Sequence, residues 1–285
     1  MTLADSHIVP KQEIPIRIQE YAVGVFETVS TKSALKKALK KGLLKVDGKI
    51  ATSAIFIRGG EKITLYQSEE KQYQKKLRLS LEVVFEDDYL AIINKPAGIL
   101  VSGNKFKTIA NALPQNLKPS SQRDAVTPQP VHRLDYPTTG LLLIGKTSTI
   151  ILALNKLFEN KEIQKEYFAV TIGKMDSSGV IDFPVDEKES TSCYEVIETV
   201  ASERFEFLNL VKLMPKTGRR HQLRKHLYAI GNPILGDREY GFERLILIGK
   251  GLYLHALSLE FKHPVTKEIM NITSEYPKKF SKIFS

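Results

Sequence analysis

Residues 131–147 read VHRLDYPTTGLLLIGKT, and this stretch decides the fold of the larger part of the chain. A single aspartate, Asp135, follows a His-Arg-Leu triplet and precedes a Tyr-Pro-Thr-Thr-Gly turn. The almost unbroken apolar run after the turn is typical of a buried strand. The stretch therefore predicts a carboxylate at the end of a buried strand. Because Asp often caps its own backbone in turns, the residue alone leaves open whether that carboxylate is structural or catalytic.

The segment KEYFAVTIGK at residues 165–174 predicts another strand. Alternation with a period of two divides its side chains between two faces. The face expected to be core carries Phe168, Val170 and Ile172. The opposite face carries Tyr167, Ala169 and Thr171, and it is either a cleft or solvent.

The segment KTGRRHQLRKHL at residues 216–227 predicts a helix that begins near Arg219, with Thr217 available to cap it. At 100° per residue, the buried stripe of this helix consists of Leu223, Leu227 and Ile230. Arg224 borders that stripe, whereas His221 and Lys225 lie further round the helix. A partly buried arginine requires a carboxylate or a phosphate as its partner. Cations next to a helix N-terminus are also typical of a phosphate site.

The composition favours a folded protein that binds a polyanion. The chain has 285 residues, 42% hydrophobic and 26% charged, and a formal net charge of +10. It contains no run near the ~18 apolar residues that a membrane span needs, and its first residues lack the apolar core of a signal peptide. A single cysteine, Cys193, permits neither an internal disulfide nor zinc spacing. We expect a cytoplasmic protein without metal or cofactor that binds nucleic acid and no membrane.

The chain is expected to comprise a flexible tail (1–14), a small compact unit (15–66), a charged linker (67–80) and a large α+β domain (81–285). In the small unit, Thr31 and Ser33 offer N-cap oxygens to a helix over SALKKALKKG. The apolar face of this helix consists of Ala34, Leu35, Ala38 and Leu39. Gly42 is placed to end it, and Asp47-Gly48 predicts a tight hairpin.

A dense group of lysines lies in the small unit. Residues 32–49 contain seven lysines and one acid. Such a face is either a solvated surface or a binding site for RNA, since neutralised phosphates release counterions. The candidate RNA-binding residues are Lys32, Lys36, Lys37, Lys40, Lys41 and Lys45.

The sequence TKSALKKALKKGLLKVDGKI…GGEKI resembles the alpha-L RNA-binding domain, a small helix-helix-hairpin module of RNA-binding proteins. The preceding helix is weaker, because QEYAVGVFETV contains poor helix formers. The chain also has Gly60-Glu61 where the module usually has Gly-Asp. The resemblance implies that residues 15–66 bind RNA.

Five motifs in order resemble the RluA family of RNA pseudouridine synthases. They are INKPAGILV, HRLDYPTTGLLLIGKT, KEYFAV, TGRRHQLRKHL followed by GNPILGD, and LYLHALSLEFKHP. The resemblance implies a catalytic domain built on a mixed, mostly antiparallel central sheet with flanking helices and a cleft across its middle. The chain departs from the family at Tyr136-Pro137, where a basic pair is more usual.

The resemblance also implies an activity and a set of site residues. The enzyme would break the uridine glycosidic bond, rotate the base and rejoin it through carbon five, which requires no metal or cofactor. Asp135 would be catalytic, Arg224 its ionic partner, and Tyr167 the residue under the flipped base. The residues expected to bind substrate are Lys95, His132, Arg133, Thr139, Arg219, Arg220, His221 and Gln222.

Two other functions remain as alternatives. A glycosidase or nucleoside hydrolase usually needs a second carboxylate across the bond, and Glu166 is expected to face away from Tyr167. A non-catalytic RNA chaperone or assembly factor gains nothing from a carboxylate in its RNA cleft. The expected substrate is large-subunit ribosomal RNA first and transfer RNA second, and the expected state is a monomer.

Overall fold

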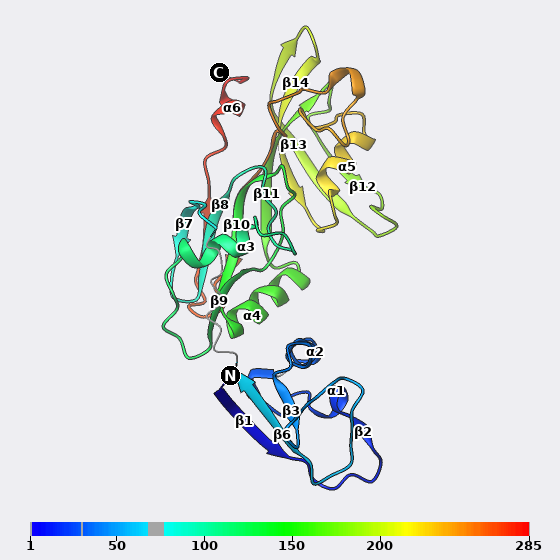
Figure 1. Ribbon diagram of the computed structural model, residues 1–285. Coiled ribbons are helices and arrows are strands. Elements are labelled where there is room, and N and C mark those ends of the chain that lie inside the picture. The colour runs from blue at the N-terminus through cyan, green and yellow to red at the C-terminus, as the bar shows by residue number, and fades with distance from the viewer. Residues whose placement is uncertain (1, 30, 68–76, 285) are drawn as a thin grey trace. The chain divides into compact units, whose positions relative to one another are not determined.

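The computed structural model describes residues 2–29, 31–67 and 77–284, which form two compact units, residues 1–75 and 76–285 (Figure 1). The division falls within the segment 67–80 that the sequence predicts as a linker. Residues 68–76 of that segment lie outside the described residues.

Unit 1 holds a four-stranded sheet of order β1-β6-β3-β4 and a separate pair β2-β5 within its described residues. Its elements are β1 Thr2–Ile8, β2 Ile16–Arg17, α1 Ile18–Tyr21, a 3-10 turn Glu27–Val29, α2 Lys32–Lys40, β3 Leu44–Val46, β4 Lys49–Ile50, β5 Phe56–Ile57 and β6 Lys62–Gln67. Ile18, Leu35, Leu44 and Ile57 contribute to its core.

The expected tail at residues 1–14 is wrong for most of its described part. Thr2–Ile8 form β1, which pairs antiparallel with β6. The side chains of β1 are nearly all exposed, so the strand has no buried apolar face to reveal it in the sequence. Backbone hydrogen bonds to β6 hold it instead, and pairing of this kind depends on a partner more than fifty residues away in the chain.

The predicted helix and hairpin of unit 1 are confirmed. Thr31 Oγ1 accepts a hydrogen bond from the Ala34 N–H at 3.1 Å, at the start of α2. Asp47 and Gly48 have φ of 49° and 80°, as a tight hairpin between β3 and β4 requires. Glu61 replaces the aspartate usual at its position, and its carboxylate accepts the Arg58 and Gly59 N–H groups at 2.8 and 2.6 Å.

Unit 2 is an α+β domain on a mixed sheet, as predicted. Its strands are β7 Glu82–Glu86, β8 Leu90–Lys95, β9 Ala125–Pro130, β10 Thr139–Thr147, β11 Gln164–Ile172, β12 Ser178–Asp182, β13 Thr191–Ser202, β14 Glu206–Pro215, β15 Leu254–Lys262 and β16 Ile269–Thr273. Its helices are α3 Ile109–Ala112, α4 Ser148–Glu159, α5 Gln222–Ala229 and α6 Lys278–Ser281, with 3-10 turns at Leu113–Gln115 and Glu243–Leu245.

The sheet of unit 2 has the order β12-β13-β14-β11-β15-β10-β8-β7 in the described residues. Its pairs are antiparallel except β10 and β15, which run parallel and pair only at Thr139–His255 and Gly140–Ala256. Beyond that point the two strands diverge, since β9 pairs with the far end of β10 and β16 with the far end of β15. Because β10 begins just after Asp135, this junction lies beside the predicted catalytic loop.

The apolar run of β10 is buried on both faces, which explains why its sequence lacks alternation. Leu141 and Leu143 pack with Ile150 and Leu154 of α4 on one side. Leu142 packs on the other side, in a cluster with the α3 region. Figure 1 shows α5 beside the other half of the sheet, where Leu223 and Leu227 join the core formed by β11 and β14.

Candidate active site

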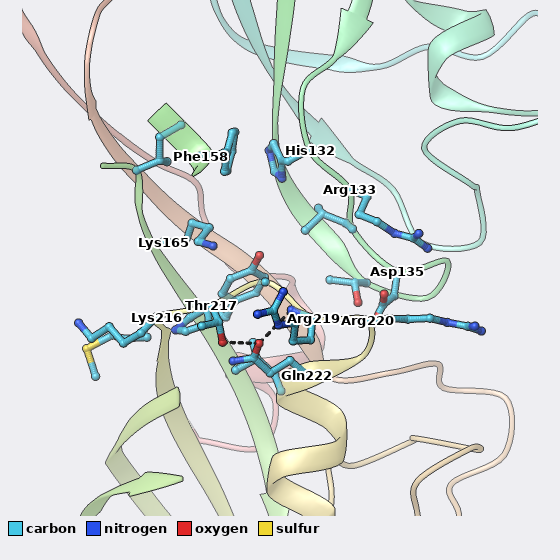
Figure 2. Close-up of a pocket in the computed structure, with 18 of the residues that line it drawn as sticks. His132, Arg133, Asp135, Phe158, Lys165, Lys216, Thr217, Arg219, Arg220 and Gln222 are labelled. Atoms are coloured by element: carbon cyan, nitrogen blue, oxygen red, sulfur yellow. Dashed lines mark hydrogen bonds between the residues drawn. The ribbon is translucent and has the colours of Figure 1, made fainter. Parts of the chain in front are cut away.

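A cleft of about 1070 Å³ lies where the Asp135 loop, the start of β11, the end of β14 and the segment before α5 meet. Figure 2 shows Asp135 facing the Arg219–Gln222 segment, while His132 and Phe158 lie together away from it. The three sequence segments predicted to form the site, 131–147, 165–174 and 216–227, therefore contribute to one cavity.

Hydrogen bonds from the Lys95 side chain hold the loop that carries Asp135. The ammonium of Lys95 is fully buried and donates to the carbonyls of Pro96, Tyr136 and Thr138 at 3.0, 3.4 and 2.8 Å. Burial lowers the pKa of Lys95 to about 8, against the opposing charge of Asp135. Lys95 was predicted to bind substrate. Since its donors are occupied by backbone carbonyls, it supports the loop and does not line the cleft.

Arg224 reaches Asp135 from α5. Its Nη1 lies 3.6 Å from Asp135 Oδ2, so the structure brings together the two residues that the sequence paired. The stronger partner is Asp237, which accepts from Nε at 2.7 Å and from Nη2 at 2.8 Å in a bidentate pair. The exposed Glu239 accepts from Nη2 at 3.2 Å. Sequence reasoning missed Asp237, although it ends the quoted motif GNPILGD.

Hydrogen bonds and the Tyr240 ring together fix the guanidinium of Arg224 in position. The side chain is 5% exposed, and its Cζ lies 4.9 Å from the Tyr240 ring centroid. Burial opposes its charge, but the hydrogen bonds and charge of Asp237 outweigh burial and raise the pKa of Arg224. Burial likewise opposes ionisation of Asp237, and Arg224 lowers the pKa of that carboxyl. A permanent cation therefore stands beside Asp135.

His221 flanks Asp135 on its other oxygen. Its Nε2 lies 3.7 Å from Asp135 Oδ1, and its Nδ1 lies 3.0 Å from the Tyr240 hydroxyl and 3.4 Å from Glu239 Oε1. The residue adopts a left-handed backbone conformation with φ of 55°, which is uncommon without glycine. The sequence placed His221 away from the buried side of a helix, but it stands before the helix, where its strained backbone turns it toward Asp135.

The helix prediction for this segment needs three corrections. Helix α5 begins at Gln222, three residues later than expected, and His221 is its N-cap residue. The Thr217 hydroxyl does not cap it but donates to Gln222 Oε1 at 2.7 Å. Ile230 is 37% exposed, because α5 ends at Ala229 and the stripe ends with it. Leu223, Leu227 and Arg224 are buried as predicted.

Gln222 was predicted to bind substrate, but its amide is fully engaged within the protein. Its Oε1 accepts from the Thr217 hydroxyl and the Arg219 N–H, and its Nε2 donates to Thr191 O and Ser192 Oγ at 3.0 and 2.9 Å. The dashed lines in Figure 2 mark the contacts around its oxygen. The buried Gln222 thus fixes the loop that presents Arg219 and Arg220 to the cleft.

Tyr167 lines the cleft from β11 and is half-buried. Burial and the charge of Asp135 raise the pKa of Tyr167, so its hydroxyl stays protonated near neutral pH. Ala169 and Thr171, expected on a cleft or solvent face, are fully buried because β11 is covered on both sides further along.

Glu166 is among the residues that line the cleft, together with its neighbours Lys165 and Tyr167. The register of β11 against β15 shifts between Glu166 and Tyr167. Because Glu166 pairs with Ser258 and Tyr167 pairs with Ala256, the extra residue of this bulge is Leu257 of β15. The carboxylate of Glu166 accepts a hydrogen bond from the Ser258 hydroxyl at 3.2 Å.

The remaining predicted substrate residues divide into exposed cations and anchored side chains. Three of the predicted substrate residues are exposed and line the cleft, namely Arg133, Arg219 and Arg220. His132 is anchored, since its Nε2 accepts the Leu143 N–H at 2.9 Å and its ring lies 4.9 Å from the Phe158 ring. Burial, then the charge of Lys165, lowers the pKa of His132 to about 3, so this histidine is neutral.

Thr139 lies at the junction of β10 and β15. Its hydroxyl is 2.7 Å from Nδ1 of the buried His255, whose Nε2 is 2.9 Å from the Ser274 hydroxyl. The cavity lining includes the neighbouring Thr138 but not Thr139. Thr139 therefore contributes to the junction rather than to the cleft.

Within the described residues, no group of three or more His, Cys, Asp or Glu is placed to hold a metal ion. None of the helices in the described part of the chain has the length and apolar character needed to cross a membrane.

Comparison with known proteins gives a consistent picture. Residues 89–229 match the RNA pseudouridylate synthase family. The chain is 31% identical to ribosomal large subunit pseudouridine synthase D of Vibrio cholerae, over 90% of this chain and 87% of that one. It is 34% identical to tRNA pseudouridine synthase C of Haemophilus influenzae, over 68% of this chain and 92% of that one.

A solved structure, human RNA pseudouridylate synthase domain containing 4, matches with a TM-score of 0.58 and 27% identity, over 70% of this chain and 90% of that one. The matched residues 89–229 include Asp135, Tyr167 and Arg224. The chain belongs to the RluA family of RNA pseudouridine synthases.

Proposed function

We propose that this RNA pseudouridine synthase uses Asp135 to start the isomerisation of uridines in large-subunit ribosomal RNA. The observation that supports the role of Asp135 is its position in the cleft, 3.6 Å from the guanidinium of Arg224 and 3.7 Å from His221. A carboxylate must be ionised to attack a carbon or to accept a proton. The guanidinium of Arg224, whose pKa is raised by Asp237, places a permanent positive charge beside that carboxylate.

Each neighbouring residue has a role in this mechanism. Asp135 either attacks the anomeric carbon of the sugar or removes a proton from the ribose, so that the glycosidic bond breaks. Tyr167 packs against the detached uracil. Its protonated hydroxyl makes it a poor base in the ground state, which favours a packing role over removal of the proton from carbon five. Lys95 and Gln222 hold the two loops that present Asp135 and the arginines.

Access to the site requires that the target nucleotide leave its helix or loop, at a cost of a few kcal/mol. Arg133 is exposed and lies two residues before Asp135 at the rim of the cleft. We assign it to fill the vacated stack or to hold a phosphate. His132, the other residue considered for this role, is neutral and anchored against Phe158, so Arg133 is the better candidate.

The choice of ribosomal RNA rests on the extent of the similarity. The large-subunit enzyme of Vibrio cholerae aligns with 90% of this chain, a larger share than unit 2 alone can supply, so the similarity extends into unit 1. The transfer RNA enzyme of Haemophilus influenzae aligns with 68%, a share that unit 2 could supply alone. Unit 1, with its exposed lysines, would bind ribosomal RNA as an alpha-L-type module. The enzyme would act as a cytoplasmic monomer.

The role of Asp135 is tested with purified wild-type protein and the Asp135→Asn variant. The substrate is large-subunit ribosomal RNA that contains [5-³H]uridine. Because the hydrogen on carbon five is lost when pseudouridine forms, released tritium measures turnover. We expect the variant to lose at least about a thousandfold in rate. Its RNA affinity should stay within about threefold, since phosphate contacts dominate binding. Undiminished tritium release would exclude the mechanism.

The substrate is tested by mapping pseudouridines in ribosomal and transfer RNA from a strain that lacks the gene and from its parent. Sites lost from large-subunit RNA, and restored by wild-type protein but not by Asp135→Asn, would support the proposal. Sites lost only from transfer RNA would overturn the choice of substrate. A complete map in the deletion strain, together with no turnover of either RNA by purified wild-type protein, would count against catalysis and favour an RNA-binding or assembly role.

A further inference from the structure

We propose that the cleft continues into an RNA-binding edge made of Tyr136, Lys105, Phe106 and Lys107, called here the aromatic edge. It would bind unpaired nucleotides next to the target uridine, by stacking on the two rings and by contacts of the lysines with phosphates. The proposal extends the proposed function, because it assumes that Asp135 acts on a nucleotide within an RNA strand.

Tyr136 directly follows Asp135 and is 55% exposed. Its backbone is fixed, since its carbonyl accepts the Gly98 N–H at 2.9 Å and the Lys95 ammonium at 3.4 Å. Its hydroxyl lies over Gly98, where an added Cβ would be 3.9 Å from it. The ring is thus supported by the turn at Gly98 and still presents a large apolar surface to solvent, next to the catalytic carboxylate.

Phe106 is the second exposed ring, and it stands between two exposed lysines. It is 51% exposed, and Lys105 and Lys107 on either side are exposed as well. The loop is held from within, since Asn111 Nδ2 donates to the carbonyls of Lys105 and Phe106 at 3.3 and 2.8 Å. The backbone is therefore fixed while the ring and both charges face solvent. A single exposed apolar residue is ordinary, but a supported ring flanked by two cations is typical of a nucleotide-binding surface.

Backbone contacts place the base of this loop close to Tyr136. The loop is closed by a bridge between Leu100 and Thr108, and the Ile109 N–H donates to the Leu100 carbonyl at 2.8 Å. Leu100 is two residues from Gly98, so their Cα atoms are at most ~7.6 Å apart. Because the Gly98 N–H donates a hydrogen bond to the Tyr136 carbonyl, the base of the loop lies close to Tyr136, which directly follows Asp135.

The chemistry of the aromatic edge fits single-stranded RNA. Every base has a π-face, so stacking on an aromatic ring tolerates any sequence, and lysines neutralise the phosphates between the bases. A nucleotide extruded into the cleft leaves its neighbours without their usual stacking partner. An exposed ring one residue from Asp135 is placed to supply that partner.

The test measures binding of fluorescein-labelled oligouridine by anisotropy, with the full chain carrying Asp135→Asn so that no turnover occurs. Tyr136→Leu and Phe106→Ala should each raise Kd about 5- to 100-fold, the range expected for loss of one base stack. Tyr136→Phe and Phe106→Tyr keep a ring and should keep Kd within about twofold of the parent. Lys105→Ala with Lys107→Ala should reduce the magnitude of the negative slope of log K against log salt by about 1.4.

A matched control is the loop after the Glu243–Leu245 turn, which also exposes an apolar residue and a lysine. Ile248→Ala with Lys250→Ala should leave Kd unchanged, since neither residue lines the cleft or belongs to the aromatic edge. Equal Kd values for Tyr136→Leu, Phe106→Ala and the parent would overturn the proposal. So would a Tyr136→Phe variant as weak as Tyr136→Leu, because a retained ring would then have no effect.

Failure of the proposed function would be seen separately. Binding is measured without turnover, whereas the role of Asp135 is measured by tritium release. If oligouridine binding depends on the two rings but Asp135→Asn remains fully active, the aromatic edge stands and the catalytic assignment falls. If Asp135→Asn is inactive and the ring variants bind normally, the catalytic assignment stands and the aromatic edge falls.

Discussion

Arg224 meets three carboxylates of different exposure, and the difference assigns them different roles. Asp237 is buried and takes the guanidinium in a bidentate pair, whereas Glu239 is about half exposed and makes one contact. Asp135 lies further away, at 3.6 Å, with its second oxygen toward His221. The pair with Asp237 thus orients the guanidinium, and Asp135, the carboxylate that we propose to be reactive, lies beside a cation that is already held.

Asp237→Asn is expected to destabilise the protein and to lower activity. The variant leaves the buried guanidinium with one negative charge fewer beside it and without its bidentate carboxylate partner. Loss of one partner of a buried ion pair typically costs about 3–5 kcal/mol in the free energy of unfolding, which urea unfolding would measure. Turnover should fall at least about tenfold, as found when groups that orient a reactive residue are removed.

Glu239→Gln is the matched control for this prediction, because it alters the exposed partner of the same guanidinium. An exposed ion pair contributes about 0–1 kcal/mol, so its free energy of unfolding should change by no more than that. If both variants lost the same stability, burial would not be what distinguishes the two carboxylates.

At the scale of residues, distant partners and local backbone conformation decide what a helical pattern can predict. The helical stripe predicted a buried Arg224 and a carboxylate partner, since burial of a guanidinium requires one. It could not predict Asp237 as the stronger partner, because Asp237 lies beyond the end of α5. The predicted position of His221 was wrong because its backbone is left-handed and not helical.

At the scale of elements, the parallel contact of β10 and β15 lies beside the cleft, which is lined by Thr138, just before β10, and by Leu254, the first residue of β15. Only two residue pairs join these parallel strands, and then they separate. Gly140 lies at this contact with φ of 111°, and a Cβ there would stand 2.3 Å from the Ala256 carbonyl oxygen and 2.5 Å from its nitrogen. The strands can approach this closely only because position 140 has no side chain.

Gly140→Ala should therefore force the two strands apart and destabilise unit 2 by more than about 2 kcal/mol. Gly103→Ala is the control, since Gly103 has a similar φ of 127° but no atom within 4 Å of an added Cβ. It carries only the backbone strain, about 1–2 kcal/mol for a left-handed L-residue. Thermal or urea unfolding of both variants measures the difference, and equal losses would show that the close approach at Gly140 is not limiting.

Elements with a strong local pattern were predictable, and those held by distant partners were not. The caps and apolar faces of α2 and α4 and the hairpin at Asp47-Gly48 depend on residues a few positions apart. Strand β1 depends instead on pairing with β6, and the bulge at Leu257 of β15 depends on pairing with β11. No short-range pattern carries that information.

At the scale of the whole molecule, a basic unit and a catalytic unit divide the work that we propose. The predicted RNA-binding lysines lie on or beside α2 and β3. All are exposed except Lys45, which is half-buried with its ammonium 4.6 Å from the Tyr66 ring centroid. The cleft with Asp135 lies within unit 2. Binding and chemistry should therefore respond separately to substitution.

Combined substitution of Lys36, Lys37, Lys40 and Lys41 by Ala is expected to weaken RNA binding without altering turnover at saturating RNA. If all four lysines contact phosphates, the negative slope of log K against log salt should become smaller in magnitude by about 3 to 4. KM for large-subunit RNA should rise while kcat stays constant, because the cleft is intact. Tritium release and filter binding at several salt concentrations would measure both quantities.

The control for this set is Lys262→Ala with Lys278→Ala, two exposed lysines of unit 2 that do not line the cleft. These substitutions lower the net charge without touching unit 1, so the salt slope should stay at its wild-type value. An equal fall in both variants would mean that net charge, and not the surface of α2, sets the affinity.

The sequence by itself determined the fold class and the family, because five motifs in order resemble those of the RluA family. The same resemblance predicts Asp135 as the reactive carboxylate, and the local patterns around it predict a buried strand after the aspartate and a partly buried arginine in a helix. Only the tertiary structure decided which predicted residues reach the cleft and which support it. Lys95 and Thr139 do not line the cleft, and their polar atoms are bound to other parts of the protein. Gln222 lines the cleft with its amide bound within the protein, and Asp237 reaches the site only through Arg224. The reason is physical, since a buried polar group must find its partner wherever the chain brings one, and that partner is set by strand pairing and bulges over long sequence distances.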